Sequence, residues 1–464
     1  MTKHLTKGAA ALVCALCAVW AVAGAQANEP AAKQPAKPKP PLKLTGHGGP
    51  VKALALSADG KLLLSGSFDY SMMAWDTSKP TPSEAGRFDD VEGAINAVAF
   101  AAGGAVLAGD DGKVRLIPAA ALKPNGARSQ PIVLEGHTHK INALDVAPGG
   151  AAIASASWDR TARIWTPGAD GTWAHRHTLE GHGGPVSAAV FSADGKSIFT
   201  ASSDGRLRRF SAATGALERA VLNHGWGLNV LTRIAGTNLI AFGATDGAVG
   251  LVDAATGEQV KTLAKHGKPV LALAHRAGRL ATAGGDGLVR VWNTKTWALI
   301  EEYRNPFGPI WALAFSADAK ALYYGGLDDA VHIWQVTPRK PFEPVPSSFP
   351  RRFQVTADSD DPVERGRIQF ARKCSVCHTL SPDSRNRAGP TLHGVFGRRI
   401  ATVKDYRYSE PLKHLDIVWT AETISKLFEL GPEVFTPGSK MPLQKMRDDR
   451  ERADLIAFLE QATK

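Results

Sequence analysis

An aspartate recurs at a nearly regular interval through the first two thirds of the chain, and this repeat limits the folds that the chain can adopt. It occurs seven times at spacings of 40 to 48 residues, and an aromatic or branched apolar residue follows it six positions later each time. A period of this length is typical of one four-stranded sheet, so residues 42–336 are expected to form seven such units. The pairs are Asp69 and Trp75, Asp111 and Ile117, Asp159 and Trp165, Asp204 and Phe210, Asp246 and Val252, Asp286 and Trp292, and Asp328 and Trp334.

A histidine near the start of five repeats keeps the same register. His47, His137, His182 and His224 each stand 22 residues before their aspartate, and His266 stands 20 before Asp286. Three of them follow a glycine, and Trp75-Asp76 ends the first repeat, whereas repeat two has Asp89 and repeat seven has Pro306 at the histidine position. By these marks the segment resembles the WD40 family of β-propellers, here with seven blades.

The resemblance to WD40 propellers implies two structural details. Within a blade, the turn aspartate, the histidine, a serine or threonine and the tryptophan would form a buried hydrogen-bonded chain, which is stable only when every member is satisfied. Residues around 42–44 would supply the outer strand of the last blade and so close the ring.

The amino terminus has the pattern of a secretory signal peptide over residues 1–27. Lys3 and Lys7 precede an apolar run at residues 9–23, and Ala25-Gln26-Ala27 predicts cleavage before Asn28. We therefore expect export to the periplasm, with an uncleaved anchor as the alternative. The run is shorter than a membrane-spanning helix needs, and the mature protein is expected to have no integral membrane segment.

Two stretches are predicted to be linkers rather than folded domains. Residues 28–41 consist mostly of Pro, Ala, Lys and Gln, and residues 337–361 are rich in proline and then polar. The formal net charge of +11 would suit nucleic acid, but export argues against that partner. Residues 362–464 are then expected to form a separate helical domain.

The helical domain contains Cys374-Ser375-Val376-Cys377-His378, the attachment motif of c-type haem. On one helical turn the two thiols can each bond a vinyl group, and the histidine can bind the iron. A structural zinc half-site would need two more ligands, and no second cysteine pair exists because Cys14 and Cys17 lie in the signal. A thioredoxin-like redox pair would not need His378. The prediction is one covalent haem c.

The rest of this domain resembles class I cytochromes c along nearly its whole length. The stretch Pro437-Gly438-Ser439-Lys440-Met441 implies that Met441 is the second axial ligand of the iron. Met446, His393 and His414 are the alternative ligands. Phe428 stands where many members have a tyrosine that contacts the methionine sulfur, so the reduction potential is expected to differ from theirs.

The same resemblance assigns roles to further residues. The carbonyl of Pro390 would accept a hydrogen bond from His378. Arg398, Tyr408 and Trp419 would hold the haem propionates, with ordinary surface and core packing as the alternative for each. Gly366 and Phe370 of the first helix would cross the last helix at Leu455 and Phe458.

An iron with histidine and methionine ligands has no open position, which favours an electron carrier over an enzyme. A basic rim is expected around the haem edge, and it predicts a redox partner with an acidic docking patch. The rim residues are Arg372, Lys373, Arg387, Lys440 and Lys445.

Three roles compete for the propeller. It could be a docking scaffold for the redox partner, which we favour; it could carry its own catalytic cofactor or metal; or the protein could be a redox sensor or an assembly factor. The histidines outside the repeat register share no spacing that would predict a metal site. They are His139, His175, His177, His275 and His332.

Overall fold

The computed structural model describes residues 43–464 except 80, 102, 123–129, 306–307, 339–359, 376, 383–388, 405, 407, 440, 442–444 and the side chain of Arg372. The predicted signal peptide, the spacer at 28–41, most of the predicted linker at 337–361 and Pro306 therefore lie outside the described residues. Within the described part of the chain, no helix is long and apolar enough to span a bilayer.

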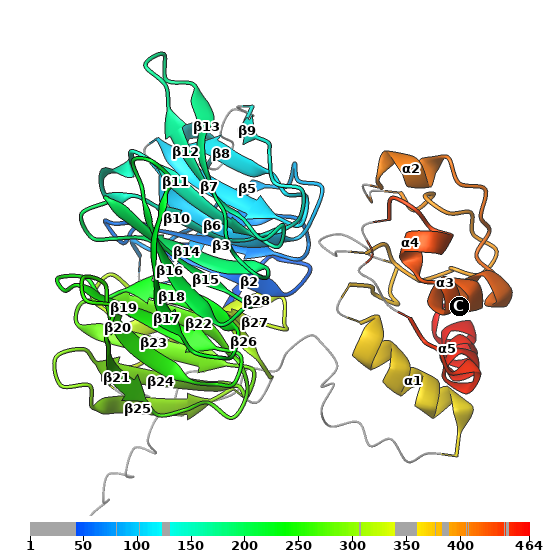
Figure 1. The fold of residues 1–464 in the computed structure, drawn as a ribbon. Helices are drawn as coiled ribbons and strands as arrows, with labels where there is room; N and C mark the ends of the chain where they lie inside the picture. Colours follow the sequence, from blue (N-terminus) through cyan, green and yellow to red (C-terminus); the bar gives the residue numbers. More distant parts are fainter. Residues whose placement is uncertain are drawn as a thin grey trace, which may run out of the picture. The chain divides into compact units, whose positions relative to one another are not determined.

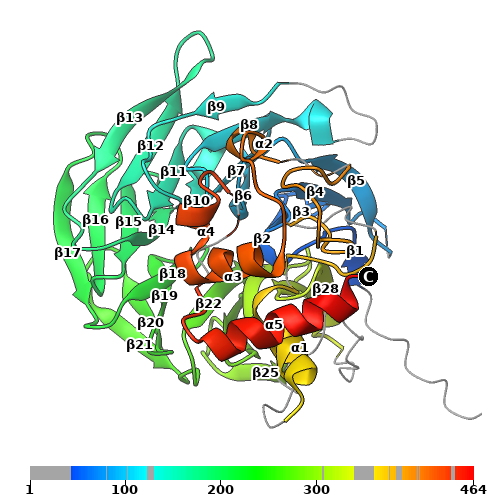
Figure 2. The same ribbon diagram turned by 90° about the vertical axis from the view of Figure 1, so that its right-hand side faces the viewer.

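The repeats form seven four-stranded antiparallel sheets, and Figure 2 shows these blades around a common axis. The first three blades consist of β2 (Val51–Leu56), β3 (Leu62–Ser67), β4 (Met72–Asp76) and β5 (Ser83–Phe88); β6 (Ile95–Ala101), β7 (Gly104–Gly109), β8 (Val114–Pro118) and β9 (Ile132–Leu134); and β10 (Ile141–Val146), β11 (Ile153–Ser157), β12 (Ala162–Pro167) and β13 (Trp173–Leu179). The short 3-10 helices η1 (Ala119–Leu122) and η2 (Pro148–Gly150) lie in connections of blades 2 and 3.

The remaining blades follow the same order along the chain (Figure 1). They consist of β14 (Val186–Phe191), β15 (Ser197–Ser202), β16 (Arg206–Ser211) and β17 (Leu217–Asn223); β18 (Leu228–Arg233), β19 (Leu239–Ala244), β20 (Val249–Asp253) and β21 (Gln259–Leu263); β22 (Val270–Arg276), β23 (Arg279–Gly284), β24 (Leu288–Asn293) and β25 (Leu299–Arg304); and β26 (Ile310–Phe315), β27 (Ala321–Gly326), β28 (Ala330–Gln335) and β1 (Lys43–Thr45). The predicted seven-bladed propeller is confirmed.

The ring closes where the expected outer strand joins the last blade. Strand β1 pairs antiparallel with β28, with Lys43 opposite His332 and Thr45 opposite Ala330. Leu44 is buried in a core cluster that also contains Val331, so closure is both hydrogen-bonded and apolar. A shared strand of this kind protects the edges that a linear array of sheets would expose.

The predicted hydrogen-bonded chain is present within the blades that keep all its members. In blade 1, Nε2 of His47 lies 2.7 Å from Oγ of Ser65, and Nε1 of Trp75 donates to the same oxygen at 2.8 Å. The Nδ1 atom of His47 lies 3.2 Å from the carboxylate of Asp69. Blade 3 repeats the arrangement with His137, Ser155, Trp165 and Asp159. These contacts connect the turn, an inner strand and the third strand of each sheet.

Five helices form the C-terminal domain: α1 (Pro362–Lys373), α2 (Glu410–Lys413), α3 (Ala421–Leu430), α4 (Pro432–Phe435) and α5 (Asp449–Ala462), counted over the described residues. Helix α1 begins with Asp361, whose carboxylate accepts a hydrogen bond from the backbone nitrogen of Val363, and Pro362 suits the first helical position. Helix α3 begins with a reciprocal capping box between Thr420 and Thr423.

Helices α1 and α5 cross in close contact. A Cβ atom on Gly366 would overlap the backbone carbonyl of Asp454, so glycine permits this approach. Arg365 makes two hydrogen bonds of 2.7 Å to the Asp454 carboxylate, and the rings of Phe370 and Phe458 pack 5.5 Å apart. This crossing was expected from the sequence, and it anchors the start of the cysteine motif.

Candidate functional site

The cysteine motif continues the last turn of α1. Cys374 ends the helix, with its backbone nitrogen donating to the carbonyl of Phe370 at 2.9 Å. The backbone nitrogens of Cys377 and His378 donate to the carbonyl of Cys374 at 3.0 and 2.9 Å. The motif is therefore a compact turn, which directs both sulfur atoms and the imidazole toward a shared space.

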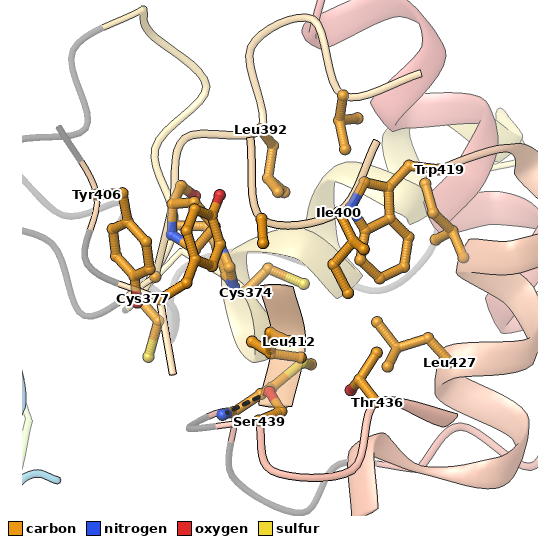
Figure 3. Close-up of a pocket in the computed structure, with 18 of the residues that line it drawn as sticks. Cys374, Cys377, Leu392, Ile400, Tyr406, Leu412, Trp419, Leu427, Thr436 and Ser439 are labelled. Carbon is orange, nitrogen blue, oxygen red and sulfur yellow. Dashed lines mark hydrogen bonds between the residues drawn. The ribbon is translucent and has the colours of Figure 1, made fainter. Parts of the chain in front are cut away.

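That space is a cavity walled mostly by apolar side chains (Figure 3). It is lined by residues from every part of the domain, and Figure 3 shows Tyr406 beside Cys377 at one side and Trp419 with Leu427 at the other. The lining residues include Cys374, Cys377, His378, Gly389, Pro390, Leu392, Arg398, Ile400, Tyr406, Tyr408, Leu412, Trp419, Leu427, Phe428, Ser439 and Met441. A mostly apolar cavity lined by two thiols and an imidazole suits a flat hydrophobic macrocycle.

The imidazole of His378 is oriented by the segment opposite it. Its Nδ1 atom donates to the carbonyl of Pro390 at 2.8 Å, which leaves Nε2 as the atom able to bind a metal. A Cβ atom on Gly389 would overlap the ring, so glycine allows the segment to pass this closely. Burial lowers the pKa of His378, which favours the neutral imidazole that a metal requires.

The four residues considered as second axial ligand lie in different surroundings. Met441 lines the cavity, and its backbone nitrogen donates to Oγ of Ser439 at 3.0 Å. Met446 is 1% exposed in the core between the helices, and its backbone is bonded to Phe428 and Arg452. Neither His393 nor His414 is among the residues that line the cavity. Of these four residues, the structure brings only Met441 to the cavity that holds His378.

The three residues proposed for the propionates all line the cavity. The guanidinium of Arg398 donates to the carbonyls of His393 and Thr391, each at 2.7 Å. Burial lowers the pKa of Arg398, as expected for a cation with limited access to water. Burial also raises the pKa of Tyr408, so its phenol remains a hydrogen-bond donor at neutral pH. A partly buried guanidinium, a phenol and the indole of Trp419 form a donor set for carboxylates.

Tyr406 is a lining residue that the sequence reasoning missed. Its ring packs against that of Tyr408 in a T-shaped pair with centroids 4.7 Å apart. Burial raises the pKa of Tyr406 well above its usual value. The sequence signal that could have identified Tyr406 is its position two residues before Tyr408, because alternate side chains of an extended segment lie on the same side.

The basic rim expected around this cavity is described only in part. Lys373 lines the cavity, whereas Lys445 forms an ion pair of 2.9 Å with Glu433. The Arg372 side chain, Arg387 and Lys440 lie outside the described residues. The charge available to a partner is therefore smaller at Lys445 than the sequence suggested.

His175 and His177 both lie on β13 (Trp173–Leu179), and the other histidines outside the repeat register have partners of their own. His139 stacks on Trp158, Nε2 of His177 lies 2.8 Å from the carbonyl of Ala213, and Nδ1 of His275 accepts the backbone nitrogen of Ala235. His332 is paired with the Asp328 carboxylate. The described residues contain no group of three His, Cys, Asp or Glu side chains placed to hold a metal ion.

Comparison with known families matches the propeller and the C-terminal domain to two different family models. Residues 363–463 match the family model described as Cytochrome c. Residues 38–76, 128–166, 173–211 and 257–293 match the model described as WD domain, G-beta repeat. These four matches fall on blades 1, 3, 4 and 6, each of which keeps the histidine and an aromatic residue of the repeat.

Individual relatives match the C-terminal domain. Cytochrome c of Cochliobolus lunatus is 39% identical over 102 residues, which are 22% of this chain and 94% of that protein. Cytochrome c2 of Blastochloris viridis is 36% identical over 93 residues, 20% of this chain and 72% of that protein. The crystal structure of the WD40 beta propeller domain of Doa1 covers 63% of this chain and 94% of that chain, with a TM-score of 0.54 and 22% identity, and so shows the fold alone.

Proposed function

Because the chain belongs to the cytochrome c family through its C-terminal domain, we propose that it transfers single electrons through one covalently bound haem c. The observation that carries this proposal is the meeting of Cys374, Cys377, His378 and Met441 at one apolar cavity. The propeller would act as a docking scaffold for a redox partner protein, because a docked partner experiences a raised effective concentration of the tethered haem domain.

The residues of the cavity fit haem c in their chemistry. When bound, the group would supply an iron that changes its oxidation state by one electron. Cys374 and Cys377 would hold it by thioether bonds, while Nε2 of His378 and the sulfur of Met441 would bind its iron. If both of these residues bind the iron, the protein would leave no ligand position for a substrate, and the domain would carry electrons rather than turn over a bound substrate.

The surrounding residues would tune and protect this centre. The carbonyl of Pro390 holds the tautomer of His378 by accepting a hydrogen bond from its Nδ1. Arg398, Tyr408 and Trp419 would place donors around the propionates, which offsets their negative charge inside the domain. Apolar neighbours such as Leu427 and Phe428 limit the access of water to the cavity.

Substitution of Met441 tests the ligand assignment. In ferric Met441→Ala protein the haem should remain attached while the sulfur-to-iron charge-transfer band disappears. The matched control is Met446→Ala, which should keep the band because Met446 is buried and is not among the residues that line the cavity. An unaltered band in Met441→Ala, or its loss in Met446→Ala alone, would exclude Met441 as the axial ligand.

We further propose that the redox partner presents an acidic patch to the haem edge. The support is Lys373 at the cavity and the formal charge of +11. The test uses two small oxidants of opposite charge, hexacyanoferrate(III) and a cationic cobalt complex. Added salt should slow the first reaction and accelerate the second. The reverse pattern would contradict a positive haem edge.

Export to the periplasm is proposed from the signal-like residues 1–27 alone. Expression in a bacterium with a periplasmic haem c maturation system, followed by cell fractionation and amino-terminal sequencing, tests it. The expected mature protein is periplasmic and begins at Asn28. A cytoplasmic protein, or one that keeps residues 1–27 as an anchor, would contradict this assignment.

A further inference from the structure

An arginine stands four residues after the turn aspartate in four of the seven blades, on the third strand of each sheet. In three of these blades the guanidinium forms an ion pair with a carboxylate of its own blade. These pairs are Arg115 with Asp111 at 2.5 Å, Arg208 with Asp204 at 2.7 Å and Arg290 with Glu302 at 2.6 Å. The fourth arginine is Arg163 of blade 3. Within the described residues it forms no ion pair, and its buried Nε atom has no hydrogen-bond partner.

Two features of blade 3 explain why Arg163 has no carboxylate partner. The turn aspartate of this blade, Asp159, faces the imidazole of His137, whose Nδ1 atom lies 2.7 Å away. The residue opposite Arg163 on the outer strand β13 is Thr178, whereas blade 6 has Glu302 at this place. Blade 3 therefore keeps the cation and lacks the anion that neutralises it in the other blades.

Other polar groups lie beside Arg163 on the same face of the sheet. The hydroxyl of Thr178 lies 2.9 Å from Nε2 of the exposed His175, whose ring packs against that of Trp165. Burial, and next the charge of Arg163, lower the pKa of His175, as expected beside a cation without a counter-ion. A partly exposed guanidinium flanked by a hydroxyl and an imidazole is a donor set suited to a carboxylate.

We propose that Arg163, Thr178 and His175 form a carboxylate-binding site, the blade 3 site, which takes an aspartate or glutamate side chain of the docked partner protein. This inference rests on the proposed function, because it takes the propeller as the docking scaffold for an acidic partner. The choice of a carboxylate follows from blades 2, 4 and 6, where a carboxylate pairs with the equivalent arginine. An anion supplied by the partner would fix the position in which the partner docks.

Binding of an acidic peptide to the haem-loaded whole chain tests the blade 3 site. The probe is a fluorescent tetrapeptide with two central glutamates and blocked ends, measured by fluorescence anisotropy at physiological salt. In Arg163→Gln the affinity should fall about tenfold or more, as for the loss of a hydrogen bond between charged groups. Arg206→Gln is the matched control, because it removes the same charge from an exposed arginine of blade 4. It should change the affinity by less than about twofold.

A second variant supplies the missing carboxylate from within the blade. Thr178→Glu places a glutamate opposite Arg163, as Glu302 is placed in blade 6. This variant should also bind the peptide about tenfold more weakly, because its own carboxylate occupies the guanidinium. Thr178→Gln, of the same size but without the charge, should lose less affinity than Thr178→Glu.

The outcomes separate the blade 3 site from the proposed function. A wild-type chain that does not bind the peptide, unchanged affinity in both Arg163→Gln and Thr178→Glu, or an equal loss in Arg206→Gln would overturn the site. Equal binding of the same peptide with glutamine in place of glutamate would also overturn it. Each of these results would leave electron transfer intact. A chain without haem c would instead overturn the proposed function, whether or not the peptide binds.

Discussion

The carboxylates of the turn aspartates in the propeller are largely shielded from water, so they need hydrogen-bonding or charged partners. The structure provides these partners in two ways. In blades 1, 3, 5 and 6 a loop histidine lies beside the carboxylate, as its spacing in the sequence predicts. Blades 2 and 7 lack that histidine, and the residue four positions after the aspartate replaces it; in blade 4 too, Asp204 pairs with Arg208 rather than with His182. Arg115 pairs with Asp111 at 2.5 Å, and His332 pairs with Asp328. His332 therefore has a structural partner that the histidine spacing did not reveal.

The imidazole of His182 gives the propeller a specific dependence on pH. Its Nδ1 donates to the carbonyl of Arg160 at 3.2 Å, and Nε2 lies 2.8 Å from the hydroxyl of Thr200. Burial, and next the charge of Arg208, lower the pKa of His182 to about 4. The folded state therefore disfavours protonation, and stability is lost as the pH falls from the unfolded value of about 6.5 toward 4.

We predict that the propeller is about 2 kcal/mol less stable at pH 5 than at pH 7 on account of this residue. His182→Gln should be less stable at pH 7 but should lose that part of the pH dependence. Urea unfolding followed by tryptophan fluorescence at both pH values measures the difference. The exposed His414→Gln is the control and should keep the full dependence. An identical pH dependence in His182→Gln and wild type would contradict the account.

Cavity residues could be predicted where a motif or the resemblance to class I cytochromes c marks them. The cysteine motif and the stretch around Met441 identified the residues at the centre of the cavity. Tyr406 was missed although it stands two residues before Tyr408, and Leu412 was missed because a leucine of this kind occurs throughout a core and only the folded chain places it at the cavity. The resemblance favoured Met441 over Met446 as the ligand, and the structure adds that Met441 lines the cavity whereas Met446 is buried and is not a lining residue.

The crossing of α1 with α5 leaves no room for a side chain at Gly366. Gly366→Ala would place a methyl group against the carbonyl of Asp454, and the helices would have to separate. We predict a loss of about 1–3 kcal/mol in the stability of the haem domain. Thermal unfolding followed at the haem absorption band measures it. Arg367→Ala, which removes an exposed ion pair of the same helix, should change stability by less than about 1 kcal/mol. Equal effects of the two substitutions would contradict this view of the crossing.

The blades could be predicted from the sequence because each repeat contains its own aspartate and, in five repeats, its own histidine. The period gave the number of blades, and β1 closes the ring on β28 as the resemblance implied. Register irregularities were not predicted: the inner strand of every blade shifts register after its first residue, as between Val51 and Ala53 in β2. Such a bulge depends on how neighbouring blades pack around the axis, and no residue type in these strands marks it.

As a whole molecule, the chain joins a protein-interaction fold to a one-electron domain. The WD40 propeller suggests binding of a protein partner, and the cytochrome c domain suggests electron transfer. In the proposed function, the propeller would hold a partner and the tethered haem domain would deliver electrons to it without depending on diffusional encounter. This account requires that the propeller itself contributes no redox centre.

A count of haems and metals tests that requirement most directly. The protein is matured in a host that attaches haem c, and a reduced-pyridine spectrum is combined with metal analysis of the purified whole chain. We predict one haem c per chain and no other metal in stoichiometric amount. A second chromophore, or another metal at one per chain, would contradict the account and make the propeller a catalytic domain.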